Sequence, residues 1–126
     1  MNHQGTRRIE TERLVLRQFS IDDTEAMYLG WAGDPEVTRF MSWPTHESPE
    51  DSRAIIEKWQ NDAILLSDYN WCITLKETGE PIGSIGAVRV DEAAEYVHVG
   101  YCIGRKYWNQ GLTSEALSAV IRFFFE

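Results

Sequence analysis

The chain has 126 residues, which is enough for one hydrophobic core and a single domain over residues 1–126. Its formal net charge of −8 argues against binding to nucleic acid or to an anionic membrane, and it suits a basic substrate such as an amine. Two cysteines are too few for a disulfide scaffold, and no apolar run approaches a membrane span or a signal-peptide core. We therefore expect a cytoplasmic protein whose thiols are reduced.

The first half of the chain predicts one strand followed by helices. The strand is expected at about residues 13–18. Ser20 and Asp23 resemble a capping box that opens a short helix, and residues 34–35, Asp-Pro, cap another turn. Residues 48–51, Ser-Pro-Glu-Asp, begin a longer helix with a cap, a proline at the first helical position and acids in the first turn. The apolar face of that helix is expected to contain Ile55, Ile56, Trp59 and Ala63.

Three strands and a final helix follow. The strands are expected at about residues 71–75, 82–90 and 96–103, and their short connections predict antiparallel pairing. Gly83 and Gly86 are expected to mark a bulge or a close backbone approach. The apolar face of the final helix is expected to contain Leu117, Val120, Ile121 and Phe124. This order of elements predicts a mixed α+β fold.

The loop before the final helix is the most informative segment of the chain. It holds a single permissive glycine, Gly111, and the hydroxyls of Thr113 and Ser114. A helix that begins there directs unpaired backbone N–H groups and the positive end of its dipole at the loop, so phosphate is the natural occupant. The chain contains no Gly-Lys-Ser or Gly-Lys-Thr of a P-loop, and the glycines of residues 83–86 have the wrong spacing for a dinucleotide fold. We expect another kind of phosphorylated cofactor.

Two segments resemble the GNAT superfamily of acetyl-CoA-dependent N-acetyltransferases. The run Trp108-Asn109-Gln110-Gly111-Leu112-Thr113 resembles the superfamily pattern Gln/Arg-x-x-Gly-x-Gly/Ala. Residues 11–17, Thr-Glu-Arg-Leu-Val-Leu-Arg, are similar to the first strand of its ribosomal-protein N-terminal acetyltransferase branch. Asn109 replaces a frequent glycine, which is mild because asparagine tolerates left-handed backbone. Thr113 replaces the usual glycine or alanine and either crowds the pyrophosphate or adds a hydroxyl donor.

The resemblance implies a fold, a cosubstrate and site residues. The implied fold is a mostly antiparallel central sheet with helices on both faces, of which this chain would be a partial domain lacking the last strands and helix. The implied reaction is direct attack on acetyl-CoA by a primary amine, at a protein N-terminus or on a small molecule. His98 stands where the related branch often has Glu and is the candidate base, its unperturbed pKa being about 6.5. The implied acetyl-CoA-binding positions are Tyr101, Cys102, Ile103, Trp108, Asn109, Gln110, Gly111, Leu112, Thr113 and Ser114.

Several alternatives stay open at this point. His98 is either the base or a structural strand histidine, and only the backbone of residues 101–103 is assigned a role. Arg105 and Lys106 either meet the phosphates of CoA or are solvated loop charges. Four apolar side chains either line an acceptor pocket or form a small core: Trp31, Phe40, Met41 and Trp43. The whole chain is either an acetyltransferase or a non-catalytic CoA-binding module. An exposed last strand would favour a homodimer or completion by another polypeptide.

Overall fold

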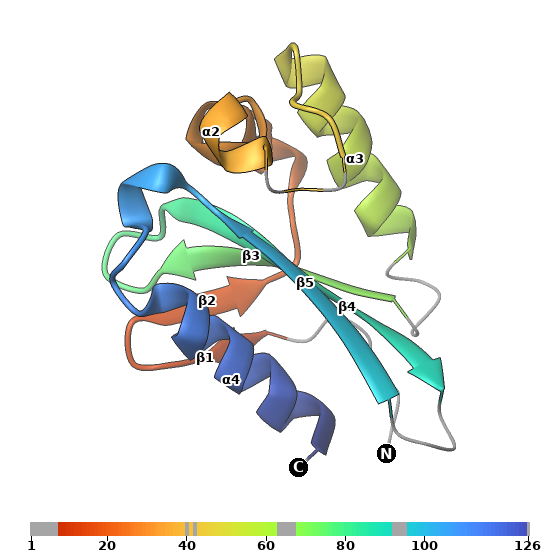
Figure 1. Cartoon of the computed structure of the whole chain (residues 1–126), viewed down its shortest axis with the longest axis vertical. Helices are drawn as coiled ribbons and strands as arrows, with labels where there is room; N and C mark the ends of the chain where they lie inside the picture. The colour runs from red at the N-terminus through yellow and green to blue at the C-terminus, as the bar shows by residue number, and fades with distance from the viewer. Residues whose placement is uncertain (1–7, 40, 42, 63–67, 92–95, 126) are drawn as a thin grey trace.

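The structure is a computed structural model that describes residues 8–39, 41, 43–62, 68–91 and 96–125 (Figure 1). Within these residues, one sheet has its strands in chain order, and every neighbouring pair is antiparallel. Its strands are β1 Ile9–Glu10, β2 Leu14–Arg17, β3 Asp68–Leu75, β4 Pro81–Asp91 and β5 Tyr96–Ile103. The predicted α+β class with an antiparallel sheet is therefore confirmed, and the bounds of β5 are those expected from the sequence.

Short helical segments connect β2 to the longer helix α3. They are η1 Ile21–Asp23, α1 Thr24–Met27, η2 Tyr28–Ala32 and α2 Pro35–Thr38, followed by α3 Pro49–Asp62. The predicted capping box is present, since the Ser20 hydroxyl accepts from the Asp22 amide and the Asp23 carboxylate accepts from the Ser20 amide. The Asp34 carboxylate likewise caps α2 by accepting from the Glu36 amide. The start of α3 at the predicted proline is also confirmed.

Two local features differ from the prediction. Strand β1 was not expected; it has two residues and pairs with β2, with Ile9 opposite Leu16. The expected short helix changes from the α-helical α1 to the π-helical turn η2. The Gly33 amide closes this wider turn by donating to the Tyr28 carbonyl at 2.9 Å. A side chain at position 33 would lie 2.7 Å from that same carbonyl, so the turn requires glycine.

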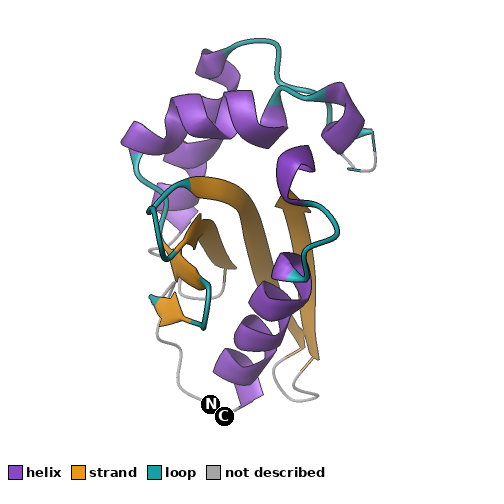
Figure 2. Ribbon diagram, turned by 90° about the vertical axis from the view of Figure 1, so that its left-hand side faces the viewer, coloured by secondary structure: helices purple, strands orange, loops and turns teal. Residues whose placement is uncertain are grey.

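The hydrophobic core lies on both faces of the sheet, as successive residues of β3 show. Trp71 belongs to a cluster that α4 (Leu112–Phe125) covers, whereas Cys72 belongs to a cluster that the helices of the first half cover. Figures 1 and 2 show α4, blue in Figure 1, apart from α2 and α3. The first cluster includes Leu14, Leu16, Tyr69, Ile73, Ile85, Leu112, Ala116 and Val120. The second includes Phe19, Met27, Trp31, Val37, Ile56 and Cys102.

The predicted apolar face of the last helix was partly wrong. Val120 is buried and Leu117 is partly buried, but Ile121 is 47% exposed. The buried stripe begins at Leu112 and continues through Ala116, so it is rotated relative to the predicted one. The predicted face began at Leu117 and therefore missed Leu112 and Ala116, which pack the start of α4 against the sheet. Phe124, the remaining predicted position, lies where the structure does not describe the side chain.

Gly83 permits the close contact between β4 and β5. A side chain at Gly83 would lie 2.3 Å from the Cys102 carbonyl oxygen and 2.9 Å from the Ile103 Cα atom. The pairing of β3 with β4 shifts register beside Gly83, between Ile73 and Thr74. Both expected meanings of this glycine, a bulge and a close approach, are therefore met near the end of β5 that leads into the loop.

Candidate anion-binding site

The backbone between β5 and α4 turns sharply at two residues. A single 3₁₀ turn, η4 Arg105–Tyr107, is followed by Asn109 with a φ of 63° and Gly111 with a φ of 75°. Both values lie in the left-handed region, where asparagine and glycine are favoured. The expectation that Asn109 tolerates this conformation agrees with the structure. The two turns bring the chain to the first residue of α4, Leu112.

The first turn of α4 leaves a group of hydrogen-bond donors open. The Glu115 amide donates to the Gly111 carbonyl at 3.1 Å, which begins the helical ladder. Within the described ranges, the amides of Leu112, Thr113 and Ser114 have no backbone acceptor, and the Thr113 and Ser114 hydroxyls have no hydrogen bond. Such donors at the positive end of a fourteen-residue helix suit a phosphate group.

Hydrogen bonds within the loop hold its shape. The Trp108 indole N–H donates to the Ile103 carbonyl at 3.0 Å, which fastens the loop to the end of β5. The Gln110 side chain donates to the Lys106 carbonyl at 3.2 Å, and the Tyr107 hydroxyl donates to the Glu80 carboxylate at 2.9 Å. The side chains of Trp108 and Gln110 thus already have a structural role. Within the described residues, the backbone amides of Asn109, Gln110 and Gly111 have no backbone acceptor, like those of Leu112, Thr113 and Ser114.

The two basic residues of the loop have protein partners. The Arg105 Nε atom lies 3.1 Å from the Oδ2 atom of Asp34, the residue that caps α2. The Lys106 ammonium lies 5.4 Å from the centre of the Tyr107 ring. Arg105 thus ties the loop to Asp34 at the start of α2, and its contact with the phosphates of CoA stays a prediction.

Residues from the N-terminal motif contact the first turn of α4. The Glu115 carboxylate accepts hydrogen bonds from the Arg13 amide at 2.8 Å, from the Arg13 Nε atom at 2.7 Å and from the Thr11 hydroxyl. The Arg13 Nη1 atom also donates to the Gln110 carbonyl at 2.9 Å. Burial raises the pKa of Glu115, but the hydrogen bonds from Thr11 and Arg13 outweigh it and lower that pKa overall. Sequence reasoning missed this contact, although both segments had been singled out.

The end of β5 carries the predicted acetyl- and pantetheine-contacting backbone. The Cys102 and Ile103 side chains are buried, as expected for core residues, whereas Tyr101 is 50% exposed. Burial raises the pKa of Cys102 to about 12, so its thiol is not a nucleophile near neutral pH. The resemblance also implies an oxyanion amide at a bulge in this strand. Instead, β5 pairs regularly with β4 from Val97 to Ile103, and the register shifts only beyond Val97, at Arg89 and Asp91 of β4.

His98 lies within β5, where its backbone is paired with Val88. Its side chain falls outside what the structure describes, so the base role assigned to it stays a prediction.

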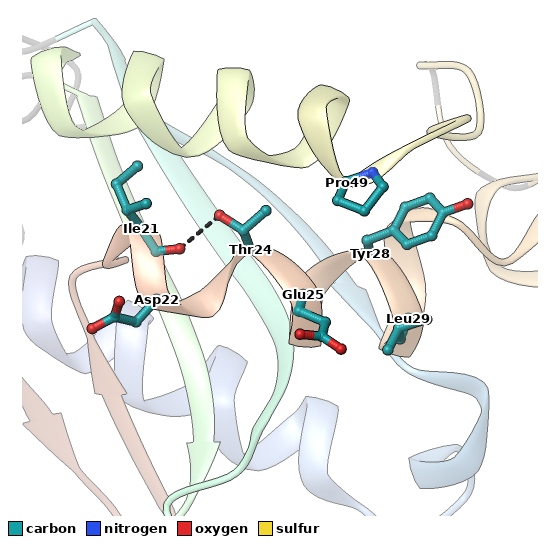
Figure 3. Close-up of a pocket in the computed structure, with 7 residues that line it drawn as sticks. All are labelled: Ile21, Asp22, Thr24, Glu25, Tyr28, Leu29 and Pro49. Carbon is teal, nitrogen blue, oxygen red and sulfur yellow. Dashed lines mark hydrogen bonds between the residues drawn. The ribbon is translucent and has the colours of Figure 1, made fainter.

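The apolar side chains near α2 belong to a core cluster. Trp31 is fully buried, and Met41 and Trp43 pack against the same cluster, while Phe40 lies outside the described residues. A pocket of about 380 Å³ lies elsewhere, beside α1 and the start of α3 (Figure 3). It is lined by Ile21, Asp22, Thr24, Glu25, Tyr28, Leu29 and Pro49, none of which belongs to the predicted site.

Two kinds of feature are absent from the described part of the chain. No helix there is long and apolar enough to cross a membrane. No three His, Cys, Asp or Glu side chains in these ranges gather closely enough to hold a metal ion.

Comparisons with known proteins identify the family of this chain. A family model described as an acetyltransferase (GNAT) domain matches residues 13–126. The uncharacterized N-acetyltransferase p20 of Bacillus licheniformis is 34% identical over 116 residues, which cover 91% of this chain and 64% of that protein.

Solved structures share the fold. A GNAT-family acetyltransferase from Bacillus anthracis has a TM-score of 0.79 and 25% identity, over 94% of this chain and 66% of that one. The Microcin C7 self immunity acetyltransferase MccE, solved with acetyl-CoA and AMP, has a TM-score of 0.76 and 20% identity, over 90% and 63% of the two chains. The chain thus spans somewhat less than two thirds of p20, and it belongs to the GNAT acetyltransferase domain family.

Proposed function

We propose that the protein transfers the acetyl group of acetyl-CoA to a primary amine. The observation that carries this proposal is the set of open donors at the start of α4, namely the amides of Leu112, Thr113 and Ser114 and two hydroxyls. These donors suit the diphosphate of CoA, because N–H and O–H groups at the positive end of a helix dipole attract anionic oxygens. Family membership supports acetyl-CoA over other phosphorylated molecules, and MccE, which shares the fold, was solved with acetyl-CoA.

The predicted cofactor residues have different roles in this proposal. Asn109 and Gly111 shape the turn, Thr113 and Ser114 add hydroxyl donors, and Trp108 and Gln110 hold the loop together. The backbone of Tyr101, Cys102 and Ile103 would lie along the pantetheine arm. Acetyl-CoA, when bound, supplies a thioester whose carbonyl carbon accepts an amine.

His98 is the proposed general base. Its imidazole accepts the proton that the ammonium form of the substrate must lose, directly or through water, and so frees the nitrogen lone pair. A nitrogen–carbon bond then forms, the carbon–sulfur bond breaks, and the second proton of the attacking nitrogen passes to the departing CoA thiolate or to water. Position 98 lies on β5, five residues before Ile103, so the base would stand on the strand that leads into the cofactor loop.

We infer that the acceptor is a cationic amine, such as a protein N-terminus or a small amine. The net charge of −8 supports this class, because it favours the approach of a positively charged substrate. The resemblance of residues 11–17 to the ribosomal-protein branch supports a protein N-terminus within the class.

A thiol-release assay with a panel of amines, run beside a calorimetric titration with CoA, tests the proposal. The protein's own thiols will contribute little signal, because burial raises the pKa of Cys72 and of Cys102 to about 12. Amine-dependent release together with CoA binding supports the transferase. CoA binding without turnover of any amine would favour a non-catalytic CoA-binding module, and a chain that binds no CoA would contradict the proposal.

A further inference from the structure

A carboxylate stands close to the place where the diphosphate is proposed to bind. Glu115 is in the first turn of α4, one residue after the open amides of Leu112, Thr113 and Ser114. A free carboxylate there would be attracted to the same amides and to the same helix dipole, and it would repel a bound diphosphate. Binding of a diphosphate here therefore requires that the Glu115 carboxylate be held away from these donors.

Arg13 holds the Glu115 carboxylate in this way. Its amide and its Nε atom both donate to the Glu115 carboxylate, at 2.8 and 2.7 Å, and the Thr11 hydroxyl adds a third hydrogen bond. The Glu115 side chain is only 17% exposed, whereas that of Arg13 is 48% exposed. The carboxylate is thus neutralised and fully engaged on the flank of the helix.

The same guanidinium also fixes the turn before the helix. The Arg13 Nη1 atom donates to the Gln110 carbonyl at 2.9 Å, and its Nη2 atom lies 3.4 Å from where a Gly111 side chain would begin. One side chain therefore contacts the residues on both sides of the open amides. The fork of an arginine can make both contacts at once, whereas a lysine would make one.

We propose that Arg13 is a positioning residue for the cofactor loop, which keeps Glu115 from competing with the diphosphate and holds the turn at Gln110. This inference rests on the proposed function, since it assumes that a diphosphate binds at the start of α4. Arg13 acts through Glu115 and Gln110 and is not assigned a contact with CoA.

The test is a double-mutant cycle read by calorimetry with CoA. Arg13→Gln should weaken CoA binding about tenfold, because the Glu115 carboxylate then loses the guanidinium that neutralises it and keeps only the hydrogen bonds from the Thr11 hydroxyl and the backbone amide of residue 13. Glu115→Gln should change the affinity by less than about twofold, and adding Glu115→Gln to Arg13→Gln should recover most of the loss. Arg13→Lys should lose less affinity than Arg13→Gln, since it keeps the charge. Arg53→Gln on α3 removes the same charge from an exposed Arg–Glu pair and serves as the matched control.

The recovery separates positioning from mere stability. A purely structural role would make the double variant the least stable protein and also the weakest binder, and that result would overturn the inference. Thermal melts of all variants show whether each folds. Arg13→Lys keeps the positive charge and provides the test if Arg13→Gln does not fold. If Arg13→Lys bound CoA as weakly as is expected for Arg13→Gln, that result would count against neutralisation of Glu115.

A parallel titration with dephospho-CoA, which lacks the 3′-phosphate, locates the effect. The loss in Arg13→Gln should persist with this probe, because the proposal concerns the diphosphate. If the loss vanishes, Arg13 contacts the 3′-phosphate directly and the positioning role is wrong. If the unsubstituted chain binds neither probe, the proposed function fails and the inference with it. Equal affinity of Arg13→Gln and the unsubstituted chain would overturn the inference alone.

Discussion

Arg13 and Glu115, 102 positions apart in the chain, are joined by two hydrogen bonds of 2.7 and 2.8 Å. The first residue belongs to the N-terminal motif and the second follows the loop at the start of α4. Two segments that read as separate signals in the sequence are therefore one structural unit. Arg13 directly precedes strand β2, and its contact with Glu115 fixes the turn between β5 and α4.

The first prediction concerns stability at acidic pH. The folded state lowers the pKa of Glu115 below its ordinary value of 4.5, because the hydrogen bonds from Thr11 and Arg13 outweigh the effect of burial. A lowered pKa means that the carboxylate stabilises the fold above the unfolded-state pKa, and that this stabilisation is lost as the pH falls through the folded-state pKa. Urea denaturation should therefore show that Glu115→Gln costs stability at pH 7 and progressively less at acidic pH. A cost that does not change with pH would contradict the assignment.

The second prediction concerns Gly111, whose φ is 75°. Gly111→Asp should abolish CoA binding, because it places a carboxylate and a side chain at the proposed anion site. The matched control is Gly79→Asp in the turn between β3 and β4, where φ is 77° and no atom lies within 4 Å of the new Cβ. Both variants should lose about 1–2 kcal/mol of stability from backbone strain. Calorimetry should find unchanged CoA affinity only for Gly79→Asp, and unchanged affinity for Gly111→Asp would show that the loop is assigned wrongly.

The third prediction tests the contact between β4 and β5. Gly83→Ala should destabilise the protein by at least about 2 kcal/mol, since the new methyl group would lie 2.3 Å from the Cys102 carbonyl oxygen, a backbone atom that moves only with the strand. Gly100→Ala is its control on β5, where no atom lies within 4 Å of the added group. Chemical denaturation should separate the two variants clearly. Equal stabilities would mean that β4 and β5 do not approach as closely at Gly83 as described.

The fourth prediction concerns His98. His98→Ala should lower the rate of acetyl transfer near neutral pH by roughly a hundredfold or more, the usual contribution of a general base. Its affinity for CoA should change little, because the proposed diphosphate site lies on α4. Steady-state kinetics across pH 6–9 would show the loss, and calorimetry would give the affinity. An unaltered rate would remove His98 from the mechanism, whereas equal losses of rate and affinity would indicate a structural strand residue.

Local signals in the sequence predicted most of the fold. The cap and proline at Ser48 and Pro49 marked the start of α3, and alternation marked β5. Asn109 was expected to tolerate left-handed backbone, and its φ of 63° agrees with that expectation. These features depend on neighbours in the chain, so a single sequence is sufficient to find them.

Features that depend on distant contacts or on very short segments could not be predicted in this way. Strand β1 has two residues, too few to show any period. The wide turn η2 depends on a hydrogen bond from Gly33 to Tyr28, which no common motif announces. The contact of Arg13 with Glu115 needs the sheet to bring the two ends of the chain together. The loop itself was predicted from its residues, but the role proposed for Arg13 in holding Glu115 away from the open amides was not.

The most direct test of the central claim is a map of amide chemical shifts during titration with CoA. We expect the largest changes at Leu112, Thr113 and Ser114, because their N–H groups would donate to the diphosphate. The pocket beside α1, which includes Tyr28 and Leu29, should change little. Shifts confined to that pocket, or no shift at the start of α4 at saturating CoA, would contradict the claim that this helix binds the cosubstrate.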